Sequence, residues 1–131
     1  MFIPPGFALI NPYMIVDNAQ LLVEFLNQAF GAKVIHLSHR PDGKIANAQI
    51  QIGDCQFMLS EATAAFPAMP ASYYVYVEDA DKSVQQAVAA GAELIMAVTD
   101  KPYGDRQGGV RDPVGNLWWI SQRLAAGPYQ D

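Results

Sequence analysis

The sequence has few of the residues that form cross-links or hold metal ions. It contains one cysteine, Cys55, and two histidines, His36 and His39. A single cysteine excludes a disulfide within the chain and a zinc site built from several thiolates. His36 and His39 are three positions apart, so on a strand their side chains point to opposite faces and do not chelate one ion together without a bulge. Cys55 lies in a predicted strand, where we expect a small core side chain.

Basic residues and long apolar runs are scarce as well. Eight Lys and Arg stand against thirteen Asp and Glu, which gives a net charge of −5, and the basic residues do not cluster. Because nucleic-acid binding needs a basic face, we expect no nucleic-acid partner. No apolar run approaches the roughly 20 residues of a membrane span, and no charged, apolar and cleavable leader is visible. We therefore expect a cytoplasmic protein without a membrane partner.

The first half of the chain predicts a βαβββ order. Of the 131 residues, 51% are hydrophobic, which suffices for one domain with a sizeable core. Asp17-Asn18 supplies a helix cap, apolar residues recur at helical spacing over 19–30, and Gly31 ends the helix. The expected strands are 9–16, 33–40, 44–52 and 55–60. In 44–52, alternation predicts that Ala46, Ala48, Ile50 and Ile52 face the helix and that Asn47, Gln49 and Gln51 face away.

The second half repeats this order after a linker at 61–71. Strand 72–77, helix 80–90 and strand 93–98 are followed by a hairpin whose turn is Asp112-Pro113-Val114-Gly115-Asn116. Corresponding residues of the two halves are offset by 60 or 61 positions, as in Val16-Asp17-Asn18-Ala19 and Val77-Glu78-Asp79-Ala80. We predict an α+β fold in one domain, with βαβββ modules at 9–60 and 72–123. Two such modules in tandem would form a concave mixed sheet with the helices on its outer face.

The segment 103–121 has the composition of a ligand site. Trp118 and Trp119 are adjacent on a strand, so they point to opposite faces and only one of them joins the helix-facing core. Arg106 and Arg111 precede the turn, where a guanidinium can pair with a carboxylate or a phosphate. The alternative is that both arginines are solvated charges on an edge strand. A bulge at Gly108-Gly109 would change which face each side chain takes.

These features together resemble a known superfamily. The duplicated βαβββ, the Gly-Ala after each helix, the Gly53-Asp54 turn and the motif YGDRxGxxxDPxGNxW are similar to the glyoxalase/bleomycin-resistance/extradiol-dioxygenase superfamily, also called the vicinal oxygen chelate fold. The similarity runs over about 9–123 and is strongest to the PhnB-like branch. One fold hosts many chemistries, so function has to be argued from the site.

The resemblance implies where a metal would bind. Metal-dependent members carry a ligand near the start of the first strand and in the last strand of each module, usually His or Gln and Glu. The matching positions in this sequence are Asn11, Met58, Ser72 and Trp119. None of these offers the imidazole, carboxylate or thiolate that a divalent transition metal needs. The resemblance therefore implies a metal-free site without a cofactor.

The expected ligand-binding surface is aromatic and rich in amides. Tyr and Trp stack on planar ligands while their polar ends form hydrogen bonds. His36 would share a face with Val34 and Ser38 and reach this surface, or have a structural role instead. The alternative is that the rings only fill a collapsed cup or a subunit interface. The residues we expect to bind a ligand are Tyr13, Gln49, Met58, Tyr74, Tyr76, Tyr103, Arg106, Arg111 and Trp119.

The leading hypothesis is a metal-free binding protein of the bleomycin-resistance type. It would sequester an aromatic or glycopeptide-like small molecule in a groove of a homodimer, which implies a role in antibiotic resistance. The sequence shows no paired carboxylates and no nucleophile motif, so no catalytic residue is predicted. The alternative is a glyoxalase-like isomerase or lyase with a non-standard active site, in which a tyrosine or His36 carries the proton. A third hypothesis is a dimeric scaffold without a small ligand.

Overall fold

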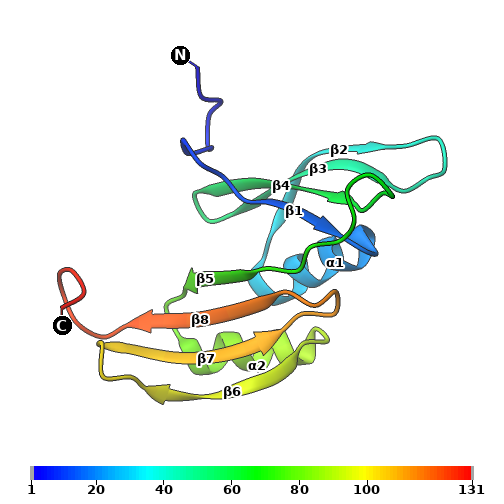
Figure 1. The fold of residues 1–131 in the computed structure, drawn as a ribbon. Coiled ribbons are helices and arrows are strands. Elements are labelled where there is room, and N and C mark those ends of the chain that lie inside the picture. The colour runs from blue at the N-terminus through cyan, green and yellow to red at the C-terminus, as the bar shows by residue number, and fades with distance from the viewer. Residues whose placement is uncertain (1, 131) are drawn as a thin grey trace. The chain divides into compact units, whose positions relative to one another are not determined.

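The computed structural model describes residues 2–130, which form a first unit ending at Pro70 and a second unit beginning at Ala71. Figure 1 shows that each unit has one sheet with one helix against it. The predicted α+β class and the tandem βαβββ order are confirmed. The first unit contains β1 (Tyr13–Val16), α1 (Ala19–Phe30), β2 (Lys33–His39), β3 (Ile45–Ile52) and β4 (Cys55–Glu61). The second contains β5 (Ser72–Tyr76), α2 (Ala80–Ala89), β6 (Glu93–Asp100), β7 (Asp105–Arg111) and β8 (Leu117–Arg123).

The two sheets have the same topology. Their strand orders are β1-β4-β3-β2 and β5-β8-β7-β6. The first and last strands of each unit pair in parallel, and the other pairs are antiparallel. Each helix therefore connects two edge strands of its own sheet. Neither helix in the part of the chain that the structure describes is long and apolar enough to cross a membrane.

Helix α1 has the predicted bounds because both of its ends are fixed by local chemistry. The Asn18 side chain accepts a hydrogen bond from the Leu21 N–H at 3.3 Å, and Gly31 ends the helix at a φ of 67°. Glu61, at the end of β4, accepts hydrogen bonds from the N–H groups of Asn18 and Ala19 at 2.8 and 2.9 Å. A carboxylate at the N-terminus also interacts favourably with the helix dipole. The start of α1 is thus attached to the last strand of its sheet.

The first strand is shorter than predicted: it begins at Tyr13, not at residue 9. The Asn11 side chain closes a turn instead, because its Oδ1 accepts from the Ala8 N–H and its Nδ2 donates to the Ala8 carbonyl, both at 2.7 Å. Pro12 follows, and proline has no N–H to contribute to a strand ladder. Asn11 therefore lies before β1 and its amide is committed to the turn.

Two irregularities in the β2–β3 pairing change which residues face α1. Ala48 and Ile50 are buried as predicted, but Ala46 is not part of that set, because Ser38 pairs with Asn47 and His39 with Ile45. The extra residue is a β-bulge, and Ile45 takes the buried position, at 3% exposed. The predicted helix-facing set is wrong at Ala46.

The second irregularity lies in β2. Val34 pairs with Ile50 and His36 with Gln49, so Ile35 is the extra residue and Val34 and His36 face opposite ways. The prediction that they share a face is wrong, whereas His36 does lie on the face opposite α1. Cys55 is exposed, because it opens β4 directly after the turn at Gly53-Asp54, so the predicted core role is wrong too.

The hairpin of the second unit is organised by a buried carboxylate. Asp112 is 3% exposed and accepts hydrogen bonds from the N–H groups of Val114 and Asn116, the Asn116 side chain and the Trp118 indole. Trp118 is 4% exposed and its ring lies 5.0 Å from that of Tyr73. Trp118 is therefore the one of the two tryptophans that joins the helix-facing core.

The adjacent glycines of β7 let groups approach from both faces of the second sheet. A Cβ on Gly108 would lie 2.7 Å from Val98 and 3.0 Å from Val84 of α2. A Cβ on Gly109 would lie 2.7 and 2.9 Å from atoms of the Trp119 ring. The bulge considered at this pair is not present: β7 pairs with β8 in continuous register, and the irregularities lie in β6. Side chains in β7 therefore alternate regularly between the two faces.

We predict that Gly109→Ala displaces the Trp119 ring, whereas Gly108→Ala separates the sheet from α2. Overpacking of this kind costs about 1–3 kcal/mol in the free energy of unfolding. Both costs can be measured by urea unfolding, and tryptophan emission separates the two variants. Gly109→Ala should change the emission of the folded protein by moving Trp119, while Gly108→Ala should leave it nearly unchanged. Identical emission from both variants would contradict this assignment of faces.

Candidate functional site

The open face of the second sheet, which we define as the face opposite α2, carries most of the predicted aromatic residues. In the strand register Tyr74, Trp119, Gly109 and Met96 form one row across the sheet. Tyr76, Ser121, Gln107 and Thr99 form the next row, and Arg123 and Asp105 follow. The topology therefore brings Tyr74, Tyr76 and Trp119 together on one surface.

Trp119 is held in a fixed orientation on this face. Its indole N–H donates to the Ser72 hydroxyl at 2.6 Å, and its ring covers the bare backbone of Gly109. The residue is half-buried, so one side of the ring remains accessible. An aromatic ring that is already oriented loses little conformational entropy when it stacks on a ligand. Of the aromatic rings on the open face, Trp119 is therefore the one best pre-organised for stacking on a ligand.

A fully buried carboxylate lies at the end of the same face. Asp105 is 0% exposed. Its Oδ2 accepts from the hydroxyls of Tyr74 and Tyr129 at 2.5 and 2.7 Å, and its Oδ1 accepts from the Arg123 guanidinium at 3.0 Å. Burial of an unpaired charge would be strongly unfavourable, and these three donors together offset that cost. They tie β5, β7, β8 and the C-terminal segment together.

The Asp105 cluster shifts the pKa values of its members. Burial raises the pKa of Asp105, but the hydrogen bonds from Tyr74, Tyr129 and Arg123 outweigh it and hold the pKa below its usual value. Burial raises the pKa of Tyr74, and its bond to the Asp105 carboxylate adds to the effect. Burial and the bonds to Tyr76 and Asp105 also raise the pKa of Tyr129. At neutral pH the cluster therefore consists of one carboxylate, one guanidinium and protonated phenols.

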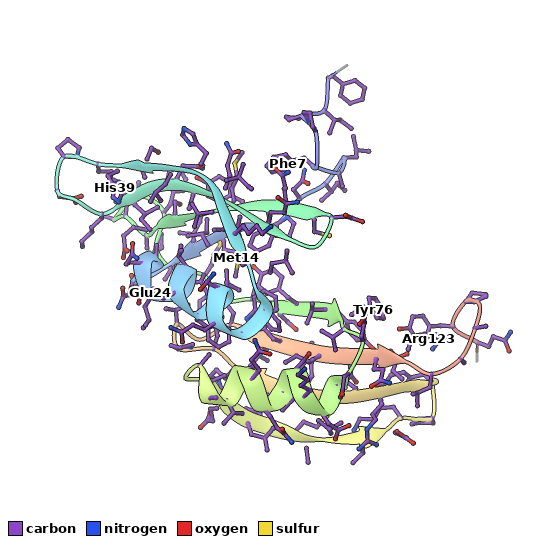
Figure 2. The ribbon with its side chains drawn as sticks, turned by 180° about the vertical axis from the view of Figure 1, so that it is seen from behind. Phe7, Met14, Glu24, His39, Tyr76 and Arg123 are labelled. Atoms are coloured by element: carbon purple, nitrogen blue, oxygen red, sulfur yellow. The ribbon has the colours of Figure 1, made fainter. Side chains whose placement is uncertain are left out.

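The C-terminal segment 124–130 folds back onto this cluster. The N–H of Leu124 donates to the Gly104 carbonyl at 2.9 Å, and Gly127 turns the chain at a φ of 85°. The Tyr129 ring then lies over the Arg123 guanidinium, whose Cζ atom is 4.1 Å from the ring centroid. A pocket of 770 Å³ opens there, lined among others by Tyr76, Gln122, Arg123 and Tyr129. Figure 2 shows Tyr76 and Arg123 at the end of the sheet next to the C-terminal loop.

The structure pairs both predicted arginines with carboxylates, and only Arg111 shares the open face by register. Arg106 points to the helix side, where it donates to both carboxylate oxygens of Asp81 on α2, at 2.7 and 3.0 Å, and to Asp100 at 2.9 Å. The bond to Arg106 holds the pKa of Asp81 below its usual value. Arg111 pairs with Glu93 at 2.5 Å on the edge pair β6–β7, where both side chains are exposed. Arg106 thus joins α2 to the sheet, and Arg111 is an exposed ion-paired charge.

The open face of the first sheet carries the other predicted residues. Tyr13, Met58, Gln49 and His36 form one row across β1, β4, β3 and β2. The Met58 sulfur accepts from the Asn47 amide at 3.6 Å. A pocket of 360 Å³ lies beside this row and is lined by Tyr13, Ile15, Ala46, Ser60 and Phe66 together with charged and polar residues. The β-bulge in β3 places Ala46 in the lining of this pocket, where a larger side chain would reduce the pocket volume.

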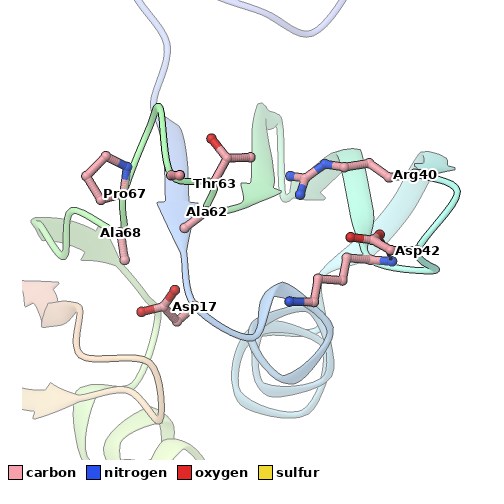
Figure 3. A pocket seen from close by; sticks show the side chains of 9 residues that line it. Asp17, Arg40, Asp42, Ala62, Thr63, Pro67 and Ala68 are labelled. Carbon is pink, nitrogen blue, oxygen red and sulfur yellow. Dashed lines mark hydrogen bonds between the residues drawn. The ribbon is translucent and has the colours of Figure 1, made fainter.

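A second pocket of the first unit is charged and has a different composition. It has a volume of 460 Å³ and is lined by Asp17, Arg40, Asp42, Lys44 and the linker residues Ala62 to Ala64, Pro67 and Ala68. Figure 3 shows Arg40 and Asp42 across the pocket from Pro67 and Ala68. The Arg40 guanidinium donates to the backbone carbonyls of Ile45 and Glu61, so it anchors the linker side of the unit. Charged side chains of both signs line this pocket, and no aromatic residue is among its lining residues.

The four family metal positions do not fit a divalent metal ion. Each side chain lacks a strong donor and already has a partner: Asn11 binds Ala8, Met58 accepts from Asn47, and Trp119 donates to Ser72. Within residues 2–130 no group of three His, Cys, Asp or Glu side chains is arranged to hold a metal ion. The donor chemistry of Asn, Met, Ser and Trp is the decisive point, because none supplies an anionic or imidazole ligand.

Sequence reasoning missed Asp105, Gln107, Arg123 and Tyr129. Gln107 is 3% exposed and accepts a hydrogen bond from the Tyr103 hydroxyl. Strand alternation contained part of the signal, since Arg123 follows Trp119 and Ser121 at period two, and Asp105 and Gln107 precede Gly109 in the same way. Tyr129 follows the last strand and has no periodic signal. Only the folded chain brings it to Asp105.

We predict that the Tyr74 phenol makes stability fall at alkaline pH. A raised folded-state pKa means that the contribution of Tyr74 is present below pH 10.0 and is lost as the pH rises above it. The free energy of unfolding of the wild type should therefore decline more steeply above that pH than that of Tyr74→Phe. At neutral pH the variant should lose about 1 kcal/mol, because one hydrogen bond to a half-exposed phenol is removed. Parallel pH curves for the two proteins in urea unfolding would contradict this role.

Comparison with known proteins agrees with the sequence-based resemblance. Uncharacterised proteins of Mycobacterium bovis and Mycobacterium tuberculosis are each 30% identical over 124 residues, which is 86% of this chain and 82% and 73% of theirs. The solved structure of TioX from Micromonospora sp. ML1 superposes with a TM-score of 0.75 at 25% identity, over 89% of this chain and 99% of that one.

A PhnB protein from Bacillus cereus has the same fold, with a TM-score of 0.70 at 17% identity over 88% of this chain and 99% of that one. A family model of the Glyoxalase/Bleomycin resistance protein/Dioxygenase superfamily matches residues 8–120. By this match, the chain belongs to the glyoxalase/bleomycin resistance protein/dioxygenase superfamily.

Proposed function

We propose that the protein binds a small aromatic molecule without a metal ion, on the open face of its second unit. The observation that carries this proposal is the orientation of Trp119, whose ring is fixed by Ser72 and Gly109 next to Tyr74. Aromatic pairs contribute roughly 0.5–1.5 kcal/mol beyond the burial of area, so a planar ligand gains from stacking here. The residues at the family metal positions support binding over metal-assisted chemistry.

The ligand class follows from charge as well as shape. The chain has a net charge of −5, which favours the approach of a cationic ligand. The proposal therefore includes sequestration of a glycopeptide-like antibiotic, as in the bleomycin-resistance members of the superfamily, in the cytoplasm. Arg123 takes the role predicted for Arg106 and Arg111, because it lines the pocket beside Tyr76 on the open face. Arg106 is on the helix side, and Arg111, which shares the open face by register, is paired with Glu93 at the other end of the sheet. Acidic groups of a ligand would meet it there.

A homodimer is part of the same proposal. Edge strand β2 exposes three apolar side chains, Val34, Ile35 and Leu37, which are 43%, 48% and 40% exposed. Unprotected apolar edge strands favour pairing with another chain. Sedimentation velocity of the full chain should give the mass of a dimer, and Ile35→Lys should shift it toward the monomer. A monomeric wild type over a wide concentration range would remove the dimer from the proposal.

The glyoxalase-like alternative has less support. A catalytic tyrosine would need a phenol that gives up its proton readily, whereas the pKa of Tyr74 is raised by burial and by Asp105. His36 lies on edge strand β2 and is exposed, without a carboxylate partner in its strand row. Binding therefore describes the arrangement better than proton transfer.

We predict that bleomycin and other cationic planar aromatics quench the emission of Trp119 and release heat on binding. Trp119→Phe keeps an aromatic ring but should abolish the quenching, since Trp118 is buried in the helix-facing core. Ser72→Ala frees the indole N–H and should weaken binding by about 1 kcal/mol. Titration calorimetry of the three proteins provides the measurement. An absence of both heat and quenching across the panel would refute the proposed function.

A further inference from the structure

The Tyr129 side chain lies on the open face of the second sheet and occupies a position there that a ligand could take. The C-terminal segment 124–130 is exposed throughout and has few attachments. The Leu124 N–H binds the Gly104 carbonyl at its start, and beyond it stand the long contacts of Arg123 with the carbonyls of Gly127 and Pro128, both 3.3 Å, and the Tyr129 side chain. Yet the Tyr129 hydroxyl donates to Asp105, a carboxylate that is 0% exposed. A weakly attached segment thus supplies one of three donors to a deeply buried charge.

Besides its edge contact with the Tyr103 ring, the Tyr129 side chain makes three contacts that define a chemical group. Its hydroxyl donates to Asp105 and, because that proton is used, accepts from the Tyr76 hydroxyl at 2.5 Å. Its ring lies over the Arg123 guanidinium, a cation–π contact that needs an electron-rich aromatic face. An aliphatic alcohol would satisfy only the two hydrogen bonds, and an aryl ether would lack the donor to Asp105. A neutral phenol satisfies all three, whereas a phenolate would be repelled by Asp105.

An unsatisfied polar group on the same face provides an independent observation. Ser121 is 0% exposed and stands beside Tyr76 in the strand register. Its hydroxyl has no hydrogen-bond partner of normal geometry within residues 2–130, although it lies close enough to the Tyr74 phenol to lower the pKa of that group. A buried hydroxyl without a partner is unfavourable and calls for an explanation. A ligand with a second polar substituent next to its phenol would supply the missing partner.

We propose that Asp105, Tyr76 and Arg123 form a subsite for the phenol group of a small-molecule ligand, and that Tyr129 fills this subsite until the ligand displaces it. The inference rests on the proposed binding function and names the ligand class of the same site. The C-terminal segment 124–130 then competes with the ligand for this subsite. It lowers the apparent affinity in proportion to the fraction of molecules in which the subsite is closed.

The proposal can be tested with phenol itself as the probe. Full-length wild type, Tyr129→Phe and Tyr129→Ala are titrated with phenol, and binding is followed through the backbone amide signals of β5, β7 and β8 by NMR. Tyr129→Ala empties the subsite and should bind phenol about tenfold more tightly than the wild type. Tyr129→Phe, the matched control, keeps the ring over Arg123 but loses both hydroxyl contacts, so its affinity should lie between the two.

Ligand variants replace mutation of the buried carboxylate, since Asp105→Asn could fail to fold. Against Tyr129→Ala, anisole lacks the donor and cyclohexanol lacks the aromatic face, so each should bind about tenfold more weakly than phenol. A nitrophenol that is ionised at neutral pH should also bind more weakly. Equal affinity of phenol for the wild type and Tyr129→Ala, or equal affinity of anisole and phenol for Tyr129→Ala, would overturn the proposal.

The same variants separate this inference from the proposed function. If bleomycin quenches Trp119 in both proteins but phenol does not bind Tyr129→Ala, the phenol subsite is refuted and the binding function stands. If phenol binds Tyr129→Ala as expected while no larger aromatic affects Trp119, the subsite stands and the antibiotic-binding function is refuted. If neither binds, both are refuted.

Discussion

The burial of the Asp105 carboxylate is the constraint on which the open face of the second unit depends. A charge removed from water needs donors on all sides, and these come from β5, β8 and the C-terminal segment. The position of Asp105 at the start of β7 fixes the parity of that strand, so Gln107 and Gly109 share its face. Gly109 in turn leaves room for the Trp119 ring. The aromatic surface is therefore arranged around one negative charge.

The two adjacent tryptophans of β8 lie on opposite faces of the second sheet, one in the core and one on the open face. Each indole N–H has a partner, but the partners differ: Trp118 donates to Asp112, which also closes the hairpin turn, and Trp119 donates to Ser72 on the edge strand. Trp118 stabilises the turn from within the core. Trp119 is oriented by a neighbour of the site and belongs to no core cluster. The same residue type thus has a structural role on one face and, in the proposed function, a binding role on the other.

Sequence patterns predicted the fold well because its boundaries are local. The bounds of α1 follow from Asn18 and Gly31, and the repeat revealed the tandem order. Predictions failed where one extra residue changes strand parity, at Ile35 and Ala46, because a bulge has no clear signature in composition. The face of Arg106 could not be predicted, because its partner, Asp81, lies on a helix far away in sequence. The Asp105 cluster was not foreseen for a similar reason, since Tyr129 reaches it from a segment without periodicity.

The paired glycines of β7 have a consequence for how the site can diversify. No side chain fits at Gly108 or Gly109, because α2 and Trp119 occupy the two sides of the backbone there. Substitution at the centre of the sheet is therefore costly, which makes it a poor position for adapting the site to a new ligand. Changes in ligand specificity would instead come from flanking positions of β5 and β8 and from the C-terminal segment 124–130. The flanking positions are Tyr74, Tyr76 and Ser121. Redesign of this protein, or its divergence among relatives, should leave the glycines in place and vary the rim.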